Sequence, residues 1–219
     1  MNYIIKRLIS QNRVLNDLDC RFYKYRQRKR AERKFRKDVN VTPLRLVIGA
    51  GGICSVGWIP TEIDNLNLLN PKQWKSCFKQ NTIDAILAEH VWEHLTVADG
   101  VKAAKQCYNY LKPGGYLRVA VPDGFCPDVE YIDCVRPGGS GSGAQGHKVL
   151  YNYQTFVEIF SGVGFRVDLL EYYDNRGEFH YVDWNPDNGI IRRSKRFDQR
   201  NEGGRLKYTS IIMDAHKGK

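Results

Sequence analysis

Apolar residues along this chain gather in short runs, which polar and glycine-containing stretches separate. Runs of four to eight residues are typical of buried strands, whereas the apolar positions of residues 98–111 recur at the three- and four-residue intervals of a helix. By these criteria we expect strands over 44–49, 59–63, 66–69, 83–88, 116–121, 165–172 and 208–215. Strands interspersed with helical stretches indicate an α/β fold with a mainly parallel sheet.

The first apolar run, Leu46-Val47-Ile48, breaks directly into Gly49-Ala50-Gly51-Gly52. Glycine at the tip of a parallel strand leaves the backbone uncovered, so that a ligand can lie directly on it. The next run ends at Glu62, ten residues after Gly52, and a carboxylate there can accept two hydrogen bonds from a ribose diol. A glycine loop followed by an acid one strand later predicts a site for an adenosine-containing cofactor.

The glycine spacing argues against a dinucleotide. The pyrophosphate-binding pattern G-x-G-x-x-G requires a third glycine at position 54, which is Cys54. The chain has no Gly-Lys-Ser/Thr phosphate loop, and the interval from the glycines to Glu62 is about half of that typical of NAD-binding folds. The cofactor is therefore expected to be an adenosine compound other than a dinucleotide.

Two further segments carry motifs that are specific in combination. Residues 89–95 read Glu-His-Val-Trp-Glu-His-Leu, and residues 111–115 read Leu-Lys-Pro-Gly-Gly. With the glycine loop and Gly57-Trp58, these motifs resemble those of class I S-adenosyl-L-methionine (SAM)-dependent methyltransferases of the type 11 group, over residues 44–215. The tail of the chain, from Gly177 to Ser210, resembles a bacterial subgroup of predicted methyltransferases. The resemblance implies a Rossmann-like, doubly wound seven-stranded sheet with its last strand antiparallel, and SAM as the cofactor.

On this resemblance, ten residues are expected to bind SAM. The glycine loop passes under the methionine part, Glu62 holds the ribose, and Leu69 or Trp74 covers the adenine, with a core-anchoring role as the alternative for Trp74. Many such enzymes carry an acid where this chain has Val47, so Glu89 is expected to face the cofactor's ammonium, with helix capping as its alternative. The set is Gly49, Ala50, Gly51, Gly52, Glu62, Ile63, Leu69, Trp74, Ala88 and Glu89.

Histidines are candidate catalytic residues, because a hydroxyl acceptor must lose its proton to a base. His90 lies nearest to a strand tip, and His147 follows a glycine-rich stretch. His90, Glu93 and His94 also spell H-x-x-E-H, an inverted zinc-peptidase motif, with both histidines on one face of a predicted helix. The segment follows a parallel strand beside a glycine loop and no third ligand is evident, so we expect hydrogen bonds within the fold and no metal.

The stretch 137–146 is rich in glycine. Holding so many glycines in one fixed loop costs much conformational entropy. The composition therefore predicts either a surface linker or a lid that becomes ordered over the cofactor. Its position after the strand expected at 116–121 favours the lid, since acceptor-side loops follow strand tips in these sheets.

The net charge of +10 is confined to the beginning of the chain. Residues 1–37 hold 13 Lys or Arg and three Asp or Glu, whereas residues 38–219 hold 21 of each kind. We therefore expect a basic amphipathic helical arm over 1–40 and a methyltransferase domain over 41–219. One apolar stripe runs along the arm, formed by Ile4, Leu8, Leu15, Leu18, Phe22 and Tyr25.

Three roles fit this arm: packing on its own domain or on a second copy, lying on an anionic membrane surface, or binding nucleic acid. The neutral charge of residues 38–219 argues against a long polyanion such as RNA. No apolar run has the length of a membrane span, no signal peptide is recognisable, and scattered cysteines without a C-x-x-C pair suggest buried free thiols. We expect a cytoplasmic protein, peripheral on the inner face of the membrane if the arm binds lipid.

The sequence thus predicts a SAM-dependent methyltransferase that O-methylates a sugar or surface-glycan precursor. One alternative is a SAM-binding or interaction protein without catalysis, which Val47 makes plausible. The other is an RNA methyltransferase that uses the basic arm. The methyl acceptor, the methylated atom and the oligomeric state are left open.

Overall fold

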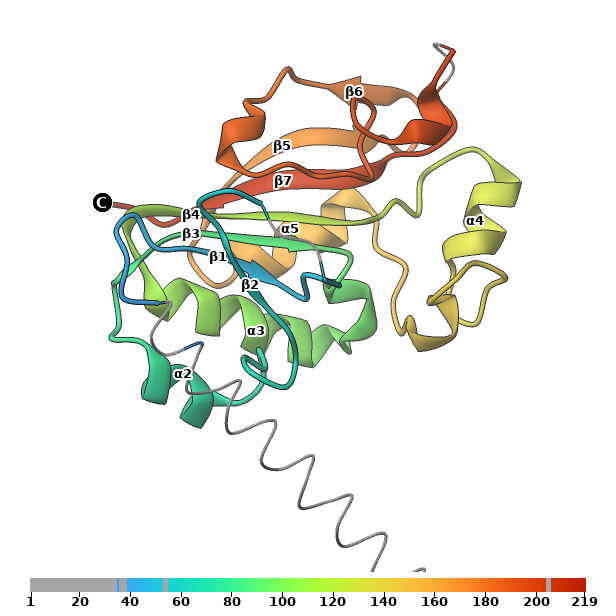
Figure 1. Ribbon diagram of the computed structural model, residues 1–219. Coiled ribbons are helices and arrows are strands. Elements are labelled where there is room, and N and C mark those ends of the chain that lie inside the picture. Colours follow the sequence, from blue (N-terminus) through green and yellow to red (C-terminus); the bar gives the residue numbers. More distant parts are fainter. Residues whose placement is uncertain (1–34, 36–38, 53–54, 204–205) are drawn as a thin grey trace, which may run out of the picture. The chain divides into compact units, whose positions relative to one another are not determined.

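The computed structural model describes residues 35, 39–52, 55–203 and 206–219 (Figure 1). The helical arm expected over 1–40 lies outside these residues except for Phe35, Val39 and Asn40, so its structure and the boundary at residue 40 remain predictions. Residues 41–219 form one structural unit, and the description below concerns this unit.

A seven-stranded sheet with the order β2-β1-β3-β4-β7-β5-β6 organises the unit (Figure 1). The first four strands are parallel, whereas β7 runs antiparallel between β4 and β5, and β6 is antiparallel to β5. This confirms the predicted α/β sheet with an antiparallel last strand. The strands are β1 (Arg45–Ile48), β2 (Ile59–Thr61), β3 (Ile83–Glu89), β4 (Leu111–Pro122), β5 (Arg166–Tyr173), β6 (Phe179–Tyr181) and β7 (Ser210–His216).

One member of the sheet differs from the expectation. The predicted strand at 66–69 is wrong, because this stretch lies in turns and irregular backbone. Asn67 holds it there: its side-chain oxygen accepts from Leu69 N at 2.8 Å, and its carbonyl accepts from the Trp74 indole at 3.0 Å. The seventh strand is β6, which extends the opposite edge of the sheet beyond β5.

Helices α3 and α5 pack against each other, and both are capped by their own sequence. In α3, Thr96 accepts a hydrogen bond from Asp99 N, and in α5 Asn152 and Thr155 form a reciprocal capping box. The buried residues of α3 recur at the spacing of one helix face: Gly100, Ala103, Ala104, Cys107 and Tyr110. The described α-helices are α2 (Pro71–Cys77), α3 (Val97–Tyr110), α4 (Val129–Val135) and α5 (Tyr153–Ser161).

The segment between β6 and β7 also packs against the sheet. Its Trp184 and Ile191 join strand residues of β1, β3, β4, β5 and β7 in one buried apolar cluster. Arg118 of β4 holds the segment against the sheet, because its guanidinium donates to the carbonyls of Asn185 at 3.0 Å and Gly189 at 2.7 Å. The irregular chain after residue 189 is thereby placed beside the tips of the parallel strands, where the functional site lies.

Within the described residues, no helix combines the length and apolar character needed to cross a membrane. The described cysteines, at positions 77, 107, 126 and 134, are free thiols. Of these, Cys107 is buried and Cys134 is exposed, so the expectation of buried thiols is correct for Cys107 and wrong for Cys134.

Candidate active site

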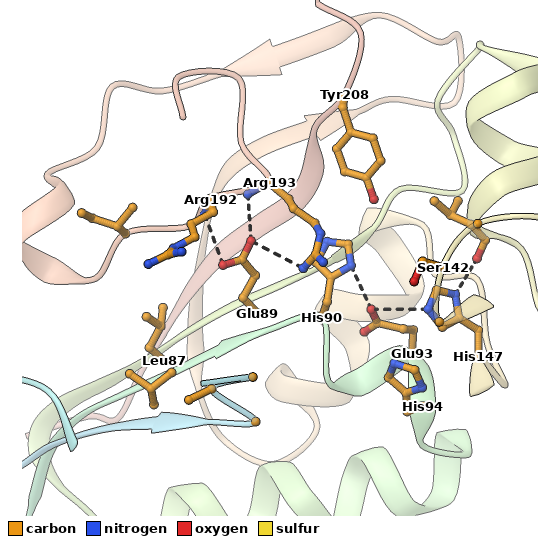
Figure 2. Close-up of a pocket in the computed structure, with 18 of the residues that line it drawn as sticks. Leu87, Glu89, His90, Glu93, His94, Ser142, His147, Arg192, Arg193 and Tyr208 are labelled. Carbon is orange, nitrogen blue, oxygen red and sulfur yellow. Dashed lines mark hydrogen bonds and ion pairs between the residues drawn. The ribbon is translucent and has the colours of Figure 1, made fainter. Parts of the chain in front are cut away.

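A cavity of about 600 Å³ lies at the carboxyl ends of β1 and β3, the edge at which open α/β sheets bind ligands. Figure 2 shows the side chains that converge on it from the tip of β3, from the loop before β7 and from the glycine-rich stretch after α4. Its volume is in the range of ligand-binding pockets. The lining residues that matter below are Gly49, Ala50, Gly51, Glu89, His90, Glu93, His94, His147, Arg192, Arg193, Arg200 and Tyr208.

The predicted glycine loop forms one wall of this cavity. Gly49 and Gly51 have φ angles of 61° and 58°, and a Cβ on Gly51 would meet nothing within 4 Å, so its backbone faces open space. The loop is tied to the end of β2, because Ala50 N donates to Thr61 O at 3.0 Å and Gly52 N donates to Glu62 Oε1 at 3.2 Å. This backbone fits a ligand that lies directly on it.

The other predicted cofactor contacts fall into two groups. Glu62 and Ile63 are exposed and Leu69 is 38% exposed, but none of the three is among the residues that line the cavity. Ala88 and Trp74 are fully buried. Stacking of Trp74 on adenine is wrong, because its ring packs against Phe78 and Tyr110 and its indole N–H is bound to Asn67 O.

Glu89 reaches the cavity from the end of β3, but its carboxylate is already engaged. Its two oxygens accept from the backbone N–H groups of Arg192 at 3.2 Å and Arg193 at 2.8 Å. Helix capping, the alternative role, is wrong, since Glu89 ends a strand and the bonds go to the loop before β7. A carboxylate has about four acceptor positions, so Glu89 can hold this loop and still face an ammonium group.

His90 has a left-handed backbone, with φ at 56°, which is uncommon for any residue but glycine. The predicted helix through 90–94 is therefore wrong: only Trp92–His94 forms a 3₁₀ turn, and His90 and His94 do not share a helix face. Ser210 Oγ donates to Arg193 O at 2.8 Å and lies 3.0 Å from His90 Nε2. The hydroxyl has a single hydrogen, so His90 donates from Nε2, and its Nδ1 lies 3.0 Å from Glu93 Oε1.

His147 lies beside Glu93 and His94 in the same cavity (Figure 2). Its Nδ1 is 2.7 Å from the carbonyl oxygen of Val135, which can only accept, so Nδ1 carries a hydrogen, and in the neutral ring Nε2 carries none. That Nε2 is 4.0 Å from Glu93 Oε1, and the rings of His94 and His147 meet edge to face at 4.8 Å between centroids. The premise that no third metal ligand is available does not hold.

The glycine-rich stretch packs tightly onto the end of α4. Ser140 N and Gly141 N donate to the carbonyls of Asp133 and Cys134, each at 3.0 Å. A Cβ on Gly139 would lie 2.2 Å from Asp133 O, and one on Gly141 would lie 2.4 Å from Cys134 O. These glycines therefore allow close packing, and the linker interpretation is wrong: residues 141–143 line the cavity.

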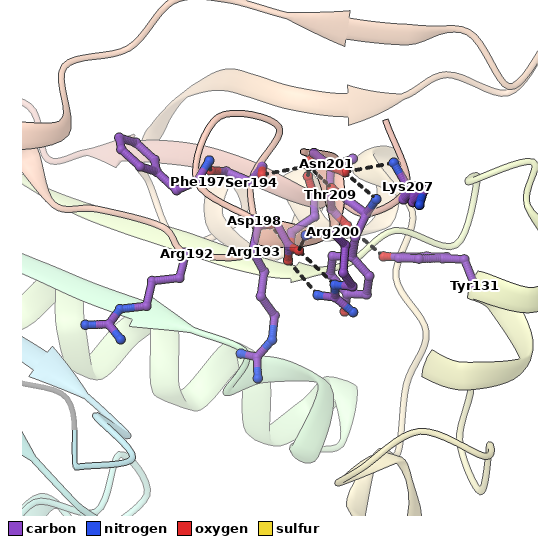
Figure 3. Close-up of polar contacts among 12 residues, drawn as sticks. Tyr131, Arg192, Arg193, Ser194, Phe197, Asp198, Arg200, Asn201, Lys207 and Thr209 are labelled. Atoms are coloured by element: carbon purple, nitrogen blue, oxygen red, sulfur yellow. Dashed lines mark hydrogen bonds and ion pairs between the residues drawn. The ribbon is translucent and has the colours of Figure 1, made fainter. Parts of the chain in front are cut away.

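The loop before β7 contributes basic residues that we did not predict. Arg192, Arg193 and Arg200 line the cavity, and Figure 3 shows Arg192 and Arg193 projecting away from the loop. Asn201 fixes this loop, accepting from Lys207 N at 2.8 Å and Tyr208 N at 2.9 Å while donating to Ser194 O at 3.1 Å. The paired arginines were visible in the sequence, but their distance from the glycine loop along the chain concealed their position.

Arg200 and Tyr208 form a stacked pair at the rim of this loop. Asp198 accepts from Arg200 at 2.8 Å and 2.5 Å, and the guanidinium lies 3.4 Å from the centre of the Tyr208 ring. Burial raises the pKa of Tyr208 to about 12. The Tyr208 phenol therefore keeps its proton at neutral pH and can donate a hydrogen bond into the cavity.

Comparison with known proteins agrees with this architecture. Residues 70–119 match the family described as "Methyltransferase domain". A search among curated proteins finds no significant match.

Solved structures of similar architecture include a SAM-dependent methyltransferase from Archaeoglobus fulgidus, with 16% identity, a TM-score of 0.46, and coverage of 87% of this chain and 94% of that one. A Thermotoga maritima methyltransferase described as a possible histamine N-methyltransferase has 13% identity, a TM-score of 0.46 and coverage of 94% and 97%. Phosphoethanolamine N-methyltransferase 2 of Haemonchus contortus, in complex with SAM, has 13% identity, a TM-score of 0.42 and coverage of 87% and 53%. None of these likenesses is close enough to transfer a substrate.

The family match covers α2, β3, α3 and most of β4, and it includes Glu89 at the end of β3 and the connection to α3 with His90, Glu93 and His94. Upstream of it, the glycine loop at the end of β1 borders the same cavity. The order of the sheet, with its antiparallel last strand, completes the agreement. Residues 70–119 thus match a methyltransferase domain, and they lie within a sheet of the Rossmann-like class.

Proposed function

We propose that this enzyme transfers the methyl group of SAM to a hydroxyl of an anionic sugar or surface-glycan precursor. The observation that carries the proposal is that one cavity is lined both by the glycine loop and by three arginines. A cofactor on the glycine loop would leave the space lined by the arginines for the methyl acceptor.

The charges of the cavity favour an acceptor with negative charge. Arg200 is neutralised by Asp198, and the guanidinium of Arg193 lies 3.9 Å from Glu89. Among the described residues, no ion-pair partner accompanies the Arg192 guanidinium, which lines the cavity. A planar guanidinium binds a phosphate or carboxylate through two parallel hydrogen bonds, so Arg192 suits the phosphate of an activated sugar.

Methyl transfer places two demands on the residues of the cavity. SAM supplies an electrophilic methyl on a sulfonium. The cavity must hold the acceptor oxygen in line with that methyl and exclude water. A phenol at Tyr208 that remains protonated and a guanidinium at Arg192 are suited to hold the acceptor in place.

The hydroxyl proton must then reach a base, and His90 is placed for this role at the tip of β3. In the tautomer with hydrogen on Nδ1, the N–H lies beside Glu93 Oε1, 3.0 Å away, and Nε2 has a free lone pair. The acceptor hydroxyl would take the place of Ser210 as the hydrogen-bond partner of Nε2. Reaching this form from the resting arrangement requires the ring hydrogen to move from Nε2 to Nδ1, because Nε2 carries it when His90 donates to Ser210.

The test is methyl transfer from radiolabelled SAM to separate pools of nucleotide sugars, sugar phosphates, neutral sugars and RNA. We expect label in the anionic sugars, and none in an analogue that lacks the methylated hydroxyl. Transfer to RNA alone would support the alternative that uses the basic arm. SAM binding without transfer to any pool would support the non-catalytic alternative.

A further inference from the structure

We infer that Glu93, His94 and His147 form a binding site for a divalent transition-metal ion of the zinc class. The three residues each offer one ligand atom, and these atoms all lie within 4.8 Å of one another. Imidazole nitrogen and carboxylate oxygen are the usual non-sulfur ligands of zinc, at about 2.0–2.2 Å from the metal. Small side-chain movements toward a common centre would bring all three within that distance.

The surroundings of the Glu93 carboxylate are the strongest sign that a cation binds here. Its side chain is 1% exposed, and neither carboxylate oxygen has a hydrogen-bond partner among the described residues. Its close contacts are with His90 Nδ1 at 3.0 Å, outside hydrogen-bond geometry, and with His147 Nε2 at 4.0 Å. A buried carboxylate without hydrogen bonds is costly, and a metal ion would satisfy it.

His147 is oriented as metal-binding histidines are. Its Nδ1 donates to the Val135 carbonyl at 2.7 Å, so that in the neutral ring Nε2, 4.0 Å from Glu93 Oε1, is free to bind a metal. Metal-binding histidines almost always donate their second ring nitrogen to a carbonyl or carboxylate, which fixes the tautomer that binds the metal. The imidazole is also buried, with 8% of its side chain exposed.

The local backbone brings the three ligands together from distant parts of the chain. Lys148 N donates to Glu93 O at 2.7 Å, which ties the stretch after the glycine-rich segment to the turn after β3. At Gly146 a Cβ would lie 3.0 Å from His94 Nδ1, so the absence of a side chain there lets the His94 ring approach. Figure 2 shows Glu93 between His90 and His147, with His94 beside it.

Glu93, His94 and His147 line the same cavity as the glycine loop. A fourth coordination position is needed for a tetrahedral zinc ion, and catalytic zinc sites leave that position to water or substrate. The bound metal would be suited to coordinate the acceptor hydroxyl; this role rests on the proposed function, whereas metal binding itself does not.

The experiment uses the full-length protein purified without a histidine tag, stripped with chelator and titrated separately with Zn²⁺ and Co²⁺. We expect one equivalent of tightly bound metal by elemental analysis, and a Co²⁺ absorption spectrum of histidine and carboxylate ligands. The variants Glu93→Gln and His147→Ala should each weaken Zn²⁺ binding by more than about 100-fold, the upper end of the effect of losing an outer-shell partner.

The matched control is His180→Ala. His180 belongs to a second cluster, with Asp174 and Glu178, whose ligand atoms are equally close, but there Asp174 is hydrogen-bonded to His180, Arg176 and Glu178. This variant should keep one equivalent of metal. Sub-stoichiometric metal in the unmodified protein, or loss of the metal in His180→Ala alone, would overturn the inference. Circular dichroism and SAM binding show independently whether each variant is folded. If a variant fails to fold, the Co²⁺ spectrum of the wild type still shows whether histidine and carboxylate ligands bind the metal.

Discussion

At the scale of single residues, Glu62 has the most clearly defined role to test. It is exposed beside the glycine loop, and one of its oxygens accepts a hydrogen bond from Gly52 N. The two hydroxyls of a ribose would donate two charge-assisted hydrogen bonds to this carboxylate, each contributing about 1.5–3 kcal/mol. We expect Glu62→Ala to weaken SAM binding more than tenfold in calorimetry, with the unfolding transition unchanged.

Asp64→Ala is the control for this prediction. Asp64 is also exposed and lies two residues further along the chain, so its removal should leave SAM affinity unchanged. Equal affinities of the Glu62→Ala variant and the wild type would show that the ribose lies elsewhere.

The buried carboxyl group of Asp123, at the end of β4, should make the free energy of unfolding depend on pH. Its side chain is fully buried, and this burial raises its pKa to about 6, against two backbone hydrogen bonds, from Tyr173 and Phe125, that lower it. Between pH 4 and 6 the folded protein therefore holds a proton that the unfolded chain has released, so this group makes folding more favourable as the pH falls through 6. Raising the pKa by about two corresponds to about 3 kcal/mol in the free energy of unfolding.

The measurement is urea unfolding of wild type and Asp123→Asn from pH 4.5 to 7.5. We expect the wild type to gain stability relative to the variant below pH 6, and the difference to be constant above pH 7. A difference that stays the same over the whole range would contradict the assignment.

The residues of the site were predictable where a local pattern encodes them. The glycine loop, Glu89, His90 and His147 all line the cavity, because glycines and polar residues directly after apolar runs mark strand tips. The arginines at 192, 193 and 200 were missed, since only the path of the chain across the sheet brings them there. For the same reason the sequence did not show that His147 lies beside Glu93.

At the scale of elements, one cross-strand pair fixes the centre of the sheet. Arg118 of β4 and Asp214 of β7 are directly opposite in the antiparallel register. The guanidinium is almost fully buried and donates twice to the carboxylate, each bond at 2.8 Å, while it also lies 4.8 Å from the centre of the Trp184 ring. Because Arg118 also holds the carbonyls of Asn185 and Gly189, it joins two strands to the segment that ends in the active-site loop.

We expect Arg118→Met to lower the free energy of unfolding by about 3–5 kcal/mol, because Asp214 then remains buried without a countercharge. A matched double variant, Arg118→Met with Asp214→Leu, should regain most of that loss, since it removes both charges. Thermal unfolding of the three proteins measures this. Equal destabilisation in the single and double variants would mean that packing, and not the buried charge, dominates.

Strands with a continuous apolar run were predicted to within a few residues, since burial on both faces leaves a clear pattern. The exceptions have physical causes. Asn67 and the Trp74 indole turn the run at 66–69 into irregular backbone, and β6 is only three residues long, with Phe179–Tyr181 all partly exposed. Short edge strands depend on a partner strand that no local pattern reveals.

At the scale of the whole molecule, charge separates the chain into two parts. The positive excess lies in residues 1–37, whereas residues 38–219 are balanced. Among the residues that the structure describes, those lining the cavity of the active site all belong to the second part. We propose that the arm locates the enzyme on an anionic surface and takes no part in binding SAM. Its apolar stripe and basic run suit the interface of an anionic membrane, where a precursor of surface glycans would be found.

Removal of residues 1–37 tests this division. The full-length protein should sediment with vesicles that contain anionic lipid, and less so as salt rises, because exposed charges are screened beyond about 8–10 Å at physiological ionic strength. The truncated protein should not sediment, yet should bind SAM with unchanged affinity, provided that light scattering shows it to be free of aggregates formed through newly exposed apolar surface. Vesicles of neutral lipid and a short RNA serve as controls for surface charge and for a polyanion. If the truncated, unaggregated protein loses its affinity for SAM, the arm is part of the active site and not a means of location.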